Sequence, residues 1–86
     1  MFLHIGNDKL INTKDIVGIF DIERTSASKI TKDFLNKAGK QRRVSYVSSN
    51  MPKSFVVCLD ENLNETVYIC PVAVSTLLKR IRKYNK

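Results

Sequence analysis

Residues 54–70 read SFVVCLDENLNETVYIC and contain a strong β-strand signal. Its two ends, 54–59 and 66–70, are rich in β-branched, aromatic and other apolar residues, and the polar segment 60–64 separates them. Two such runs joined by a short polar turn are typical of a β-hairpin. Pro71 ends the second run, because proline cannot donate a ladder hydrogen bond. The stretch therefore predicts an antiparallel hairpin within a β-sheet.

Further strands are predicted on the N-terminal side of this hairpin. Residues 2–5 form a short apolar run that the turn residues 6–8 close, and residues 10–11 continue the pairing. A further strand is expected over 15–22 and another over 44–48. Together with the hairpin, these strands predict a small and mainly antiparallel sheet.

The run 15–22 is the best strand signal of the N-terminal half. Alternation divides it into two faces: Ile16, Gly18, Phe20 and Ile22 on one, and Asp15, Val17, Ile19 and Asp21 on the other. Apolar residues on both faces indicate a central strand or one packed against a neighbour. Gly18 has no side chain, so it indicates either a bulge or a close approach of the backbone.

Two helices complete the expected architecture. A short central helix is predicted over 31–38, where Thr31 can cap the first turn and Asp33 lies near the positive end of the helix dipole. The C-terminal residues 73–84 predict an amphipathic helix, because their apolar residues recur at helical spacing: Val74, Leu77, Leu78 and Ile81. The predicted fold class is α+β.

Length and composition fit a single domain over residues 1–86. Of the 86 residues, 43% are apolar and seven are aromatic, with no Trp. This composition excludes a wholly disordered chain, a collagen-like repeat and a disulfide-dense mini-protein. A chain of this length buries only about 60–65% of the surface of its unfolded form. Such a thin core favours self-association, because neighbouring copies cover apolar surface that a monomer exposes.

Positive charge is concentrated in the middle of the chain. The net charge at pH 7 is +7, from 15 Lys and Arg against 8 Asp and Glu. Residues 24–55 hold eight bases against Asp33 alone, whereas residues 1–23 carry a net −2 and residues 56–86 a net +2. A field of this sign attracts phosphate backbones, anionic lipid head groups or acidic proteins. The alternative is a solvated basic face that only keeps a small protein soluble.

The residue pattern argues against an enzyme. His4, the only histidine, lies in an apolar strand and is expected to be a core or edge-strand residue. Cys58 and Cys70 also lie in apolar runs and are expected to be buried free thiols. Two Cys and one distant His do not supply the four ligands of a zinc site. We predict a non-enzymatic protein with no catalytic residue, no cofactor and no metal site.

Basic residues of the middle segment are the candidate contacts to nucleic acid. Arg42 and Arg43 adjoin a predicted strand, and guanidinium groups can fork onto successive phosphates. No helix-turn-helix, ribonucleoprotein motif or zinc module is present, which favours binding to the backbone over base readout. The candidate DNA-binding residues of this segment are Arg42, Arg43, Lys40, Lys53 and Lys37.

Several segments resemble the extracellular matrix regulatory protein B (RemB) family of Gram-positive bacteria. They are spread over nearly the whole chain: 4–7 (HIGN), 15–21 (DIVGIFD), 30–35 (ITKDFL), 52–57 (PKSFVV) and 75–80 (STLLKR). That family is similar to the RemA-type regulators, small DNA-binding transcription activators of biofilm matrix genes. The resemblance implies rings whose repeated basic surfaces engage double-stranded DNA, on a mainly β fold similar to the LytTR DNA-binding domain.

The chain departs from the RemA-type pattern at the arginines that this resemblance implies for DNA. A paired arginine precedes the first strand of the hairpin in that pattern, where residues 51–53 here are Met-Pro-Lys. Another arginine precedes the first long strand, where only Lys14 is basic. Lys14 and Lys53 are therefore the cations nearest to these places. Otherwise Arg42 and Arg43 form a relocated surface, or this branch does not bind DNA.

Two functions from different classes follow. The first is an oligomeric, DNA-associated transcriptional regulator of extracellular matrix genes, in which repetition in a homo-oligomer, such as a ring, strengthens weak basic contacts. The second is a protein–protein assembly module that does not bind nucleic acid. A membrane partner is not expected, because the apolar stripe of the C-terminal helix is needed by the core. With no 18-residue apolar run and no N-terminal signal peptide, we expect a cytoplasmic protein.

Overall fold

The computed structural model describes residues 1–22, 33, 36–37, 39–40, 44–48 and 51–84. Its elements in chain order are β1 (Phe2–Gly6), β2 (Lys9–Asn12), the 3-10 turn η1 (Thr13–Asp15), β3 (Ile16–Asp21), β4 (Val44–Tyr46), β5 (Ser54–Leu59), β6 (Glu65–Cys70) and α3 (Val74–Tyr84). The predicted α+β class is confirmed, with mainly antiparallel strands and a C-terminal helix. The short central helix predicted over 31–38 falls largely outside the described residues.

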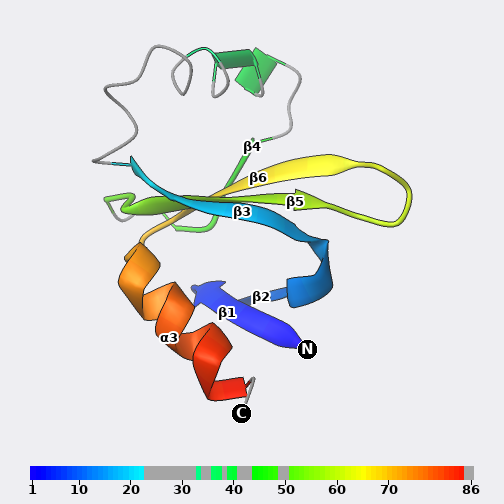
Figure 1. Ribbon diagram of the computed structural model, residues 1–86. Helices are drawn as coiled ribbons and strands as arrows, with labels where there is room; N and C mark the ends of the chain where they lie inside the picture. The colour runs from blue at the N-terminus through cyan, green and yellow to red at the C-terminus, as the bar shows by residue number, and fades with distance from the viewer. Residues whose placement is uncertain (23–32, 34–35, 38, 41–43, 49–50, 85–86) are drawn as a thin grey trace.

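The hairpin expected from residues 54–70 forms the centre of a four-stranded sheet, with the strand order β3-β5-β6-β4. β5 and β6 pair antiparallel, from Ser54 opposite Cys70 to Leu59 opposite Glu65. β3 pairs antiparallel with the other edge of β5 (Figure 1). The predicted hairpin is therefore confirmed, and it joins strands from both halves of the chain.

β4 runs parallel to its neighbour β6. Ser45 lies opposite Tyr68, and beyond the end of the strand the Val47 N–H donates to the Ile69 carbonyl at 3.0 Å. The sequence predicts a strand here but not its direction, because the partner lies more than 20 residues away and no turn links the two. The sheet is therefore mixed, with one parallel pair among its described strands.

β1 and β2 form a separate two-stranded sheet with a tight turn. Gly6 pairs with Lys9, and the two turn residues Asn7 and Asp8 have φ values of 47° and 61°. Two central residues with positive φ are typical of a type I′ turn, which Asn and Asp tolerate. Asn7 Nδ2 also donates to the Val47 carbonyl at 3.2 Å, which joins this turn to the segment after β4.

A β-bulge interrupts β3 where Gly18 predicted an irregularity. The register with β5 shifts between Ile16 and Gly18, so β3 has one extra residue there. The bulge reverses the alternation, so Ile16 and Ile19 both pack against the buried apolar residues on one face of the sheet, Val56 among them. Phe20 instead stacks on Phe55, which is one of the buried residues of the opposite face. The predicted placement of Ile16 and Phe20 on one face is therefore wrong.

The sheet separates two apolar clusters. The β1–β2 hairpin and α3 cover one face (Figure 1), and the buried residues there are Leu3, Ile5, Ile11, Val56, Cys58, Cys70 and Leu77. The buried residues of the opposite face are Phe55, Val57, Val67 and Ile69. Both cysteines are free and buried, as predicted from their apolar runs.

Two polar contacts fix α3 to the strands. Ser54 is fully buried, and its hydroxyl donates to the Val72 carbonyl at 2.7 Å just before the helix. Near the other end, Arg80 Nη1 donates to the His4 carbonyl of β1 at 2.8 Å and lies 3.4 Å from His4 Nδ1. The predicted amphipathic helix is confirmed, although Leu78 is 40% exposed. None of the helices in the described part of the chain is long and apolar enough to span a membrane.

Candidate nucleic-acid interface

Lys14 and Lys53, the two cations that the sequence resemblance places nearest to its expected arginines, lie at opposite ends of the sheet. Lys14 belongs to η1 just before β3, and Lys53 directly precedes β5. Because β3 and β5 are antiparallel, the residues that precede these two strands lie at opposite ends of the sheet. At about 3.3 Å per residue, strands of this length separate the two positions by roughly 17 Å. Within one chain the two lysines do not form a single patch.

The two lysines also differ in their surroundings. Lys14 Nζ lies 3.3 Å from Glu61 Oε1, in an exposed ion pair. Such exposed pairs contribute only about 0–1 kcal/mol, so the ion pair holds Lys14 weakly. Lys53 extends the sheet by one residue: its N–H donates to the Cys70 carbonyl at 2.8 Å, and its carbonyl accepts from the Ile22 N–H at 3.1 Å. The Lys53 side chain is therefore exposed, while its backbone is held by two hydrogen bonds to neighbouring segments.

The other predicted contacts belong to the segment between β3 and β4. Lys37 and Lys40 are exposed. The described pieces of chain at 36–37 and 39–40 lie on the side of the sheet opposite α3 (Figure 1). Arg42 and Arg43 lie outside the described residues. Among the described residues, Lys14 is therefore close neither to Lys53 nor to the pieces of chain that carry Lys37 and Lys40.

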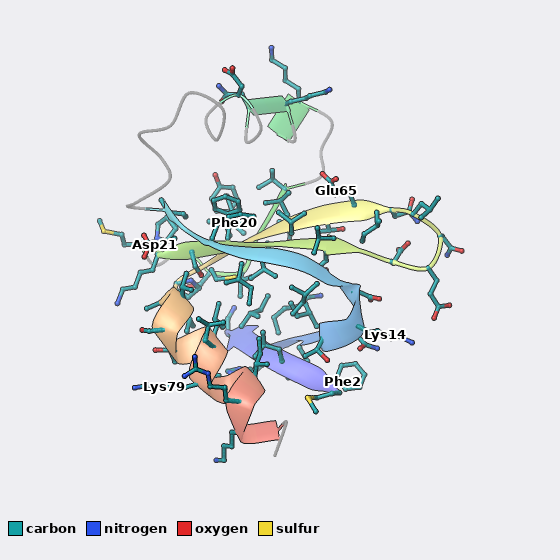
Figure 2. The ribbon with its side chains drawn as sticks, viewed as in Figure 1. Phe2, Lys14, Phe20, Asp21, Glu65 and Lys79 are labelled. Atoms are coloured by element: carbon teal, nitrogen blue, oxygen red, sulfur yellow. The ribbon has the colours of Figure 1, made fainter. Side chains whose placement is uncertain are left out.

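A further group of exposed cations lies on α3 and was missed as a candidate. Lys79, Arg82 and Lys83 are exposed, whereas Arg80 is half-buried against β1. The signal that could have found them is their spacing of three and four residues, which places them on one helix face. It was missed because cations in the last turns of a helix also stabilise its dipole. Figure 2 shows Lys79 well apart from Lys14.

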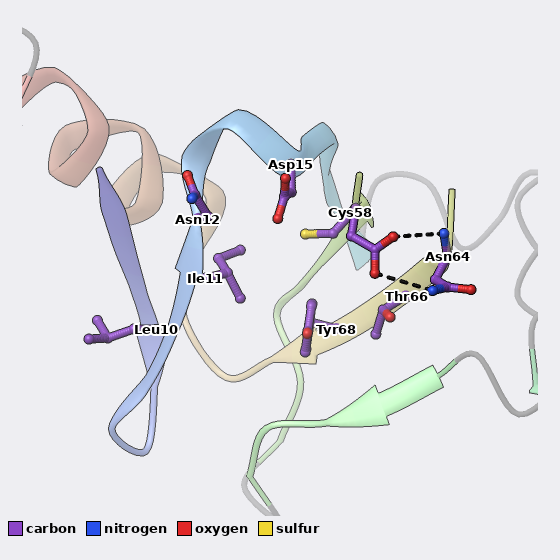
Figure 3. A pocket seen from close by; sticks show the side chains of 9 residues that line it. Leu10, Ile11, Asn12, Asp15, Cys58, Asn64, Thr66 and Tyr68 are labelled. Carbon is purple, nitrogen blue, oxygen red and sulfur yellow. Dashed lines mark hydrogen bonds between the residues drawn. The ribbon is translucent and has the colours of Figure 1, made fainter. Parts of the chain in front are cut away.

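The end of the sheet that carries Lys14 is acidic and contains a groove. Figure 3 shows this groove, of about 250 Å³, between the β1–β2 hairpin and the β5–β6 hairpin. Its lining residues are Leu10, Ile11, Asn12, Asp15, Cys58, Asp60, Asn64, Thr66 and Tyr68. Lys9 Nζ lies 5.3 Å from the centre of the Tyr68 ring, a cation–π contact. The groove is polar and carries carboxylates, so it does not suit a phosphate.

The carboxylates set the electrostatics of this end. Asp60 accepts hydrogen bonds from the Asn64 and Asn62 N–H groups, both at 2.9 Å, and these hold its pKa below the ordinary value. Burial raises the pKa of Cys58 to about 11, and the charge of Asp15 adds to this effect. Burial, followed by the charges of Cys58 and Asp15, also raises the pKa of Tyr68. At pH 7 Asp60 is therefore ionised, and the thiol and the phenol are protonated.

The described residues define a class of protein before any comparison. Burial raises the pKa of Cys70 to about 11 as well, and protonated thiols are poor nucleophiles and poor metal ligands. Within the described ranges, no three His, Cys, Asp or Glu side chains gather where they could hold a metal ion. What these residues present instead is charge: cations on α3 and in the middle segment, and carboxylates at the β5–β6 turn. The class is a small α+β domain with charged surfaces.

Comparison with known proteins gives the family within this class. The chain belongs to the RemA-like family, because the family model described as "Extracellular matrix regulatory protein A-like" matches residues 2–81. It is also similar to "Extracellular matrix regulatory protein B" of Bacillus subtilis (strain 168), with 38% identity over 80 residues. That alignment covers 93% of this chain and 89% of the relative. The resemblance noted in the sequence is confirmed.

Proposed function

We propose that the protein is a non-enzymatic, cytoplasmic regulator of extracellular matrix genes that acts on double-stranded DNA as a homo-oligomer. The observation that carries this proposal is the family match, which extends over residues 2–81 and therefore over every described strand and most of α3. The relative's name, extracellular matrix regulatory protein B, supports the regulatory role. A regulator of genes can act directly on DNA, and the positive charge of the chain favours this mode.

The charge argument rests on exposed cations rather than on the total alone. Lys37, Lys40 and Lys53 are all exposed, and they belong to the segment with a net +7. Phosphates that replace water around such side chains release condensed counterions, which makes binding favourable at low salt. Lys14 contributes less, because Glu61 neutralises it. The DNA contact is therefore proposed on the middle segment, with Arg42 and Arg43 as its strongest members.

Assembly is proposed because one copy offers few contacts. A handful of exposed Lys and Arg side chains gives weak binding, whereas several copies held together turn later contacts into intramolecular ones and raise the overall affinity by about 10²–10⁴. Apolar side chains remain exposed on the monomer, among them Val17 at 66% and Tyr46 at 70%. Covering such surface supplies a driving force for association.

The proposal is tested by titrating a fluorescent duplex with the protein at several salt concentrations. We expect binding at low salt that weakens as salt rises, with a log–log slope of about −0.9 per phosphate contacted. Arg42→Gln/Arg43→Gln removes two positive charges and should reduce the magnitude of this slope by about 2. Lys9→Gln/Lys14→Gln removes the same charge from the acidic end and serves as the matched control. It should leave the slope nearly unchanged.

Two results would change the assignment. If the assembled wild-type protein does not bind duplex DNA even at low salt, the DNA part of the proposal is wrong. If both double variants bind as wild type does, the middle segment is not the contact surface.

An assembly module that does not bind nucleic acid is the second candidate. Residues 51–53 (Met-Pro-Lys) replace the paired arginine of the family pattern, and Met51 is 82% exposed. An apolar side chain where a cation was expected favours a protein partner over a phosphate. This candidate predicts an intact oligomer with no affinity for DNA in the same titration.

A further inference from the structure

Leu63 occupies an unusual place in the turn between β5 and β6. Its φ is 63°, in the left-handed region that disfavours a branched apolar residue, and its side chain is 77% exposed. The flanking residues Asn62 and Asn64 are of the type that such a position ordinarily prefers. A leucine there neither relieves the backbone nor packs into the core of its own chain. Its place is explained if it packs against another molecule.

The turn holds Leu63 rigidly. Asp60 Oδ1 accepts from the Asn62 and Asn64 N–H groups at 2.9 Å, and the Asp60 carbonyl accepts from the Leu63 N–H at 3.0 Å. The Asp60 N–H in turn donates to the Asn64 carbonyl at 3.1 Å. A side chain presented on such a braced turn loses little conformational freedom when it binds.

A hollow that suits an apolar side chain lies at the start of α3. It has a volume of about 330 Å³, and its lining residues are Asp21, Ala73, Val74, Ser75 and Leu78. Leu78 is the residue of the helix's apolar stripe that remains 40% exposed. Asp21 is the one acidic residue among these lining residues, and it already makes an interaction within the chain. We refer to this feature as the α3 hollow.

The surroundings of the two features carry opposite charge. Asp60 and Glu61 lie in the same turn as Leu63, and the Glu61 side chain is 82% exposed. Lys79 follows Leu78 directly on α3 and is exposed, as is Arg82 one turn further. No acidic residue occurs anywhere in α3. Leu63 with Asp60 and Glu61 beside it therefore complements a partly apolar hollow with Lys79 and Arg82 beside it, and this holds with Asp21 in the lining and Lys14 next to Glu61.

From these observations we infer that Leu63 of one copy docks in the α3 hollow of a second copy, with Glu61 beside Lys79 and Arg82. The two features lie at opposite ends of β5, because Ser54 bonds to Val72, two residues before α3, and the turn begins after Leu59 (Figure 1). A contact between opposite ends repeats head to tail and closes into a ring when its rotation allows. The inference rests on the proposed homo-oligomer and names the contact that builds it.

The test is the mass of Leu63→Asn by light scattering over a range of protein concentrations. Asn tolerates positive φ, so the monomer should unfold at the same temperature as wild type or higher when both are dilute. Self-association should nevertheless weaken by about tenfold or more, because the apolar anchor is lost. Leu10→Asn makes the same substitution at another exposed leucine, which lies in β2 outside the contact, and should leave the mass at wild-type values.

A charge exchange tests the rim of the contact. Glu61→Lys and Lys79→Glu should each weaken self-association, and the two together in one chain should recover part of it, because positions 61 and 79 then pair opposite charges again while Arg82 keeps its charge. A double variant that recovers none of it contradicts the pairing.

The outcomes separate this contact from the proposed function. If wild type assembles and Leu63→Asn assembles equally well, this contact is wrong while the oligomeric regulator stands. If Leu63→Asn loses DNA affinity at unchanged mass, Leu63 contacts something other than a second copy, and the inference is also wrong. A wild-type protein that is monomeric at every concentration overturns both the contact and the proposed assembly.

Discussion

Gly18 shows how one residue sets the geometry of β3. A Cβ atom at this position would lie 2.7 Å from Cε2 and Cζ of Phe20, so the phenyl ring lies directly over the glycine. The same ring stacks on Phe55, with centroids 5.0 Å apart and an interplanar angle of 19°. An aromatic ring that covers a strand glycine beside a bulge stabilises an otherwise weak point of a sheet.

Gly18→Ala is expected to destabilise the fold by about 1–2 kcal/mol, because the added methyl displaces the Phe20 ring from its stack on Phe55. Chemical denaturation measures this loss. In a Phe20→Ala background the same change should cost much less, since the clash is gone. Gly39→Ala is the matched control: no atom lies within 4 Å of its added Cβ, and it should be neutral or mildly stabilising. Equal effects at the two glycines would contradict this account of the bulge.

The sequence predicted the irregularity at Gly18 but not its effect on the residues before it. Gly18 indicated an irregularity, and one is present. The consequence for Ile16 could not be read from the pattern, because a single extra residue reverses the face of every position before it. Whether Gly18 forms a bulge or only allows a close approach of the backbone depends on its pairing with β5, which lies more than 30 residues away in the sequence.

At the scale of elements, the attachment of α3 to β1 depends on a cation used inward. Arg80 Nη1 donates to the His4 carbonyl at 2.8 Å, in a half-buried contact between residues 76 positions apart. Leu77, fully buried one turn earlier, supplies the apolar part of the same attachment. Of the basic residues in the helix, Arg80 therefore serves the fold, and Lys79, Arg82 and Lys83 remain at the surface.

Arg80→Ala is expected to lower the free energy of unfolding by about 1–3 kcal/mol, because a charge-assisted hydrogen bond is lost and the His4 carbonyl is left without that donor. Thermal or urea unfolding at low protein concentration measures the loss. Lys83→Ala, an exposed cation of the same helix, should change the stability by less than half as much. If the two variants are equally stable, the contact does not hold α3 to β1.

The elements that could be predicted are those formed by neighbours in the sequence. Alternation and turn residues identified both hairpins, and helical spacing identified α3. The parallel direction of β4 and the order of the sheet could not be predicted, because they depend on pairing between distant segments. The two lysines near the family's arginine positions illustrate the same point: Lys14 and Lys53 both precede a strand, and only the antiparallel pairing of those strands separates them.

At the scale of the whole molecule, charge is divided between two ends. Carboxylates gather around the β5–β6 turn, where Asp60 and Glu61 lie and where Lys14 is neutralised. The exposed cations lie on α3 and in the middle segment, which includes Lys53. A single copy therefore has a weak basic surface and two ends of opposite charge. In an assembly, the acidic end of one copy can pair with the basic end of the next, and the basic surface is present several times.

The central claim is that the assembled protein, and not the single copy, is what binds DNA. Light scattering of wild type and Leu63→Asn, each with and without a duplex at low and at high salt, tests this most directly. We expect a wild-type mass of several copies, a complex with DNA at low salt that dissociates at high salt, and a variant that self-associates and binds DNA much more weakly. A wild-type monomer, or a dissociated variant that binds the duplex as tightly as the wild-type assembly, would contradict the claim.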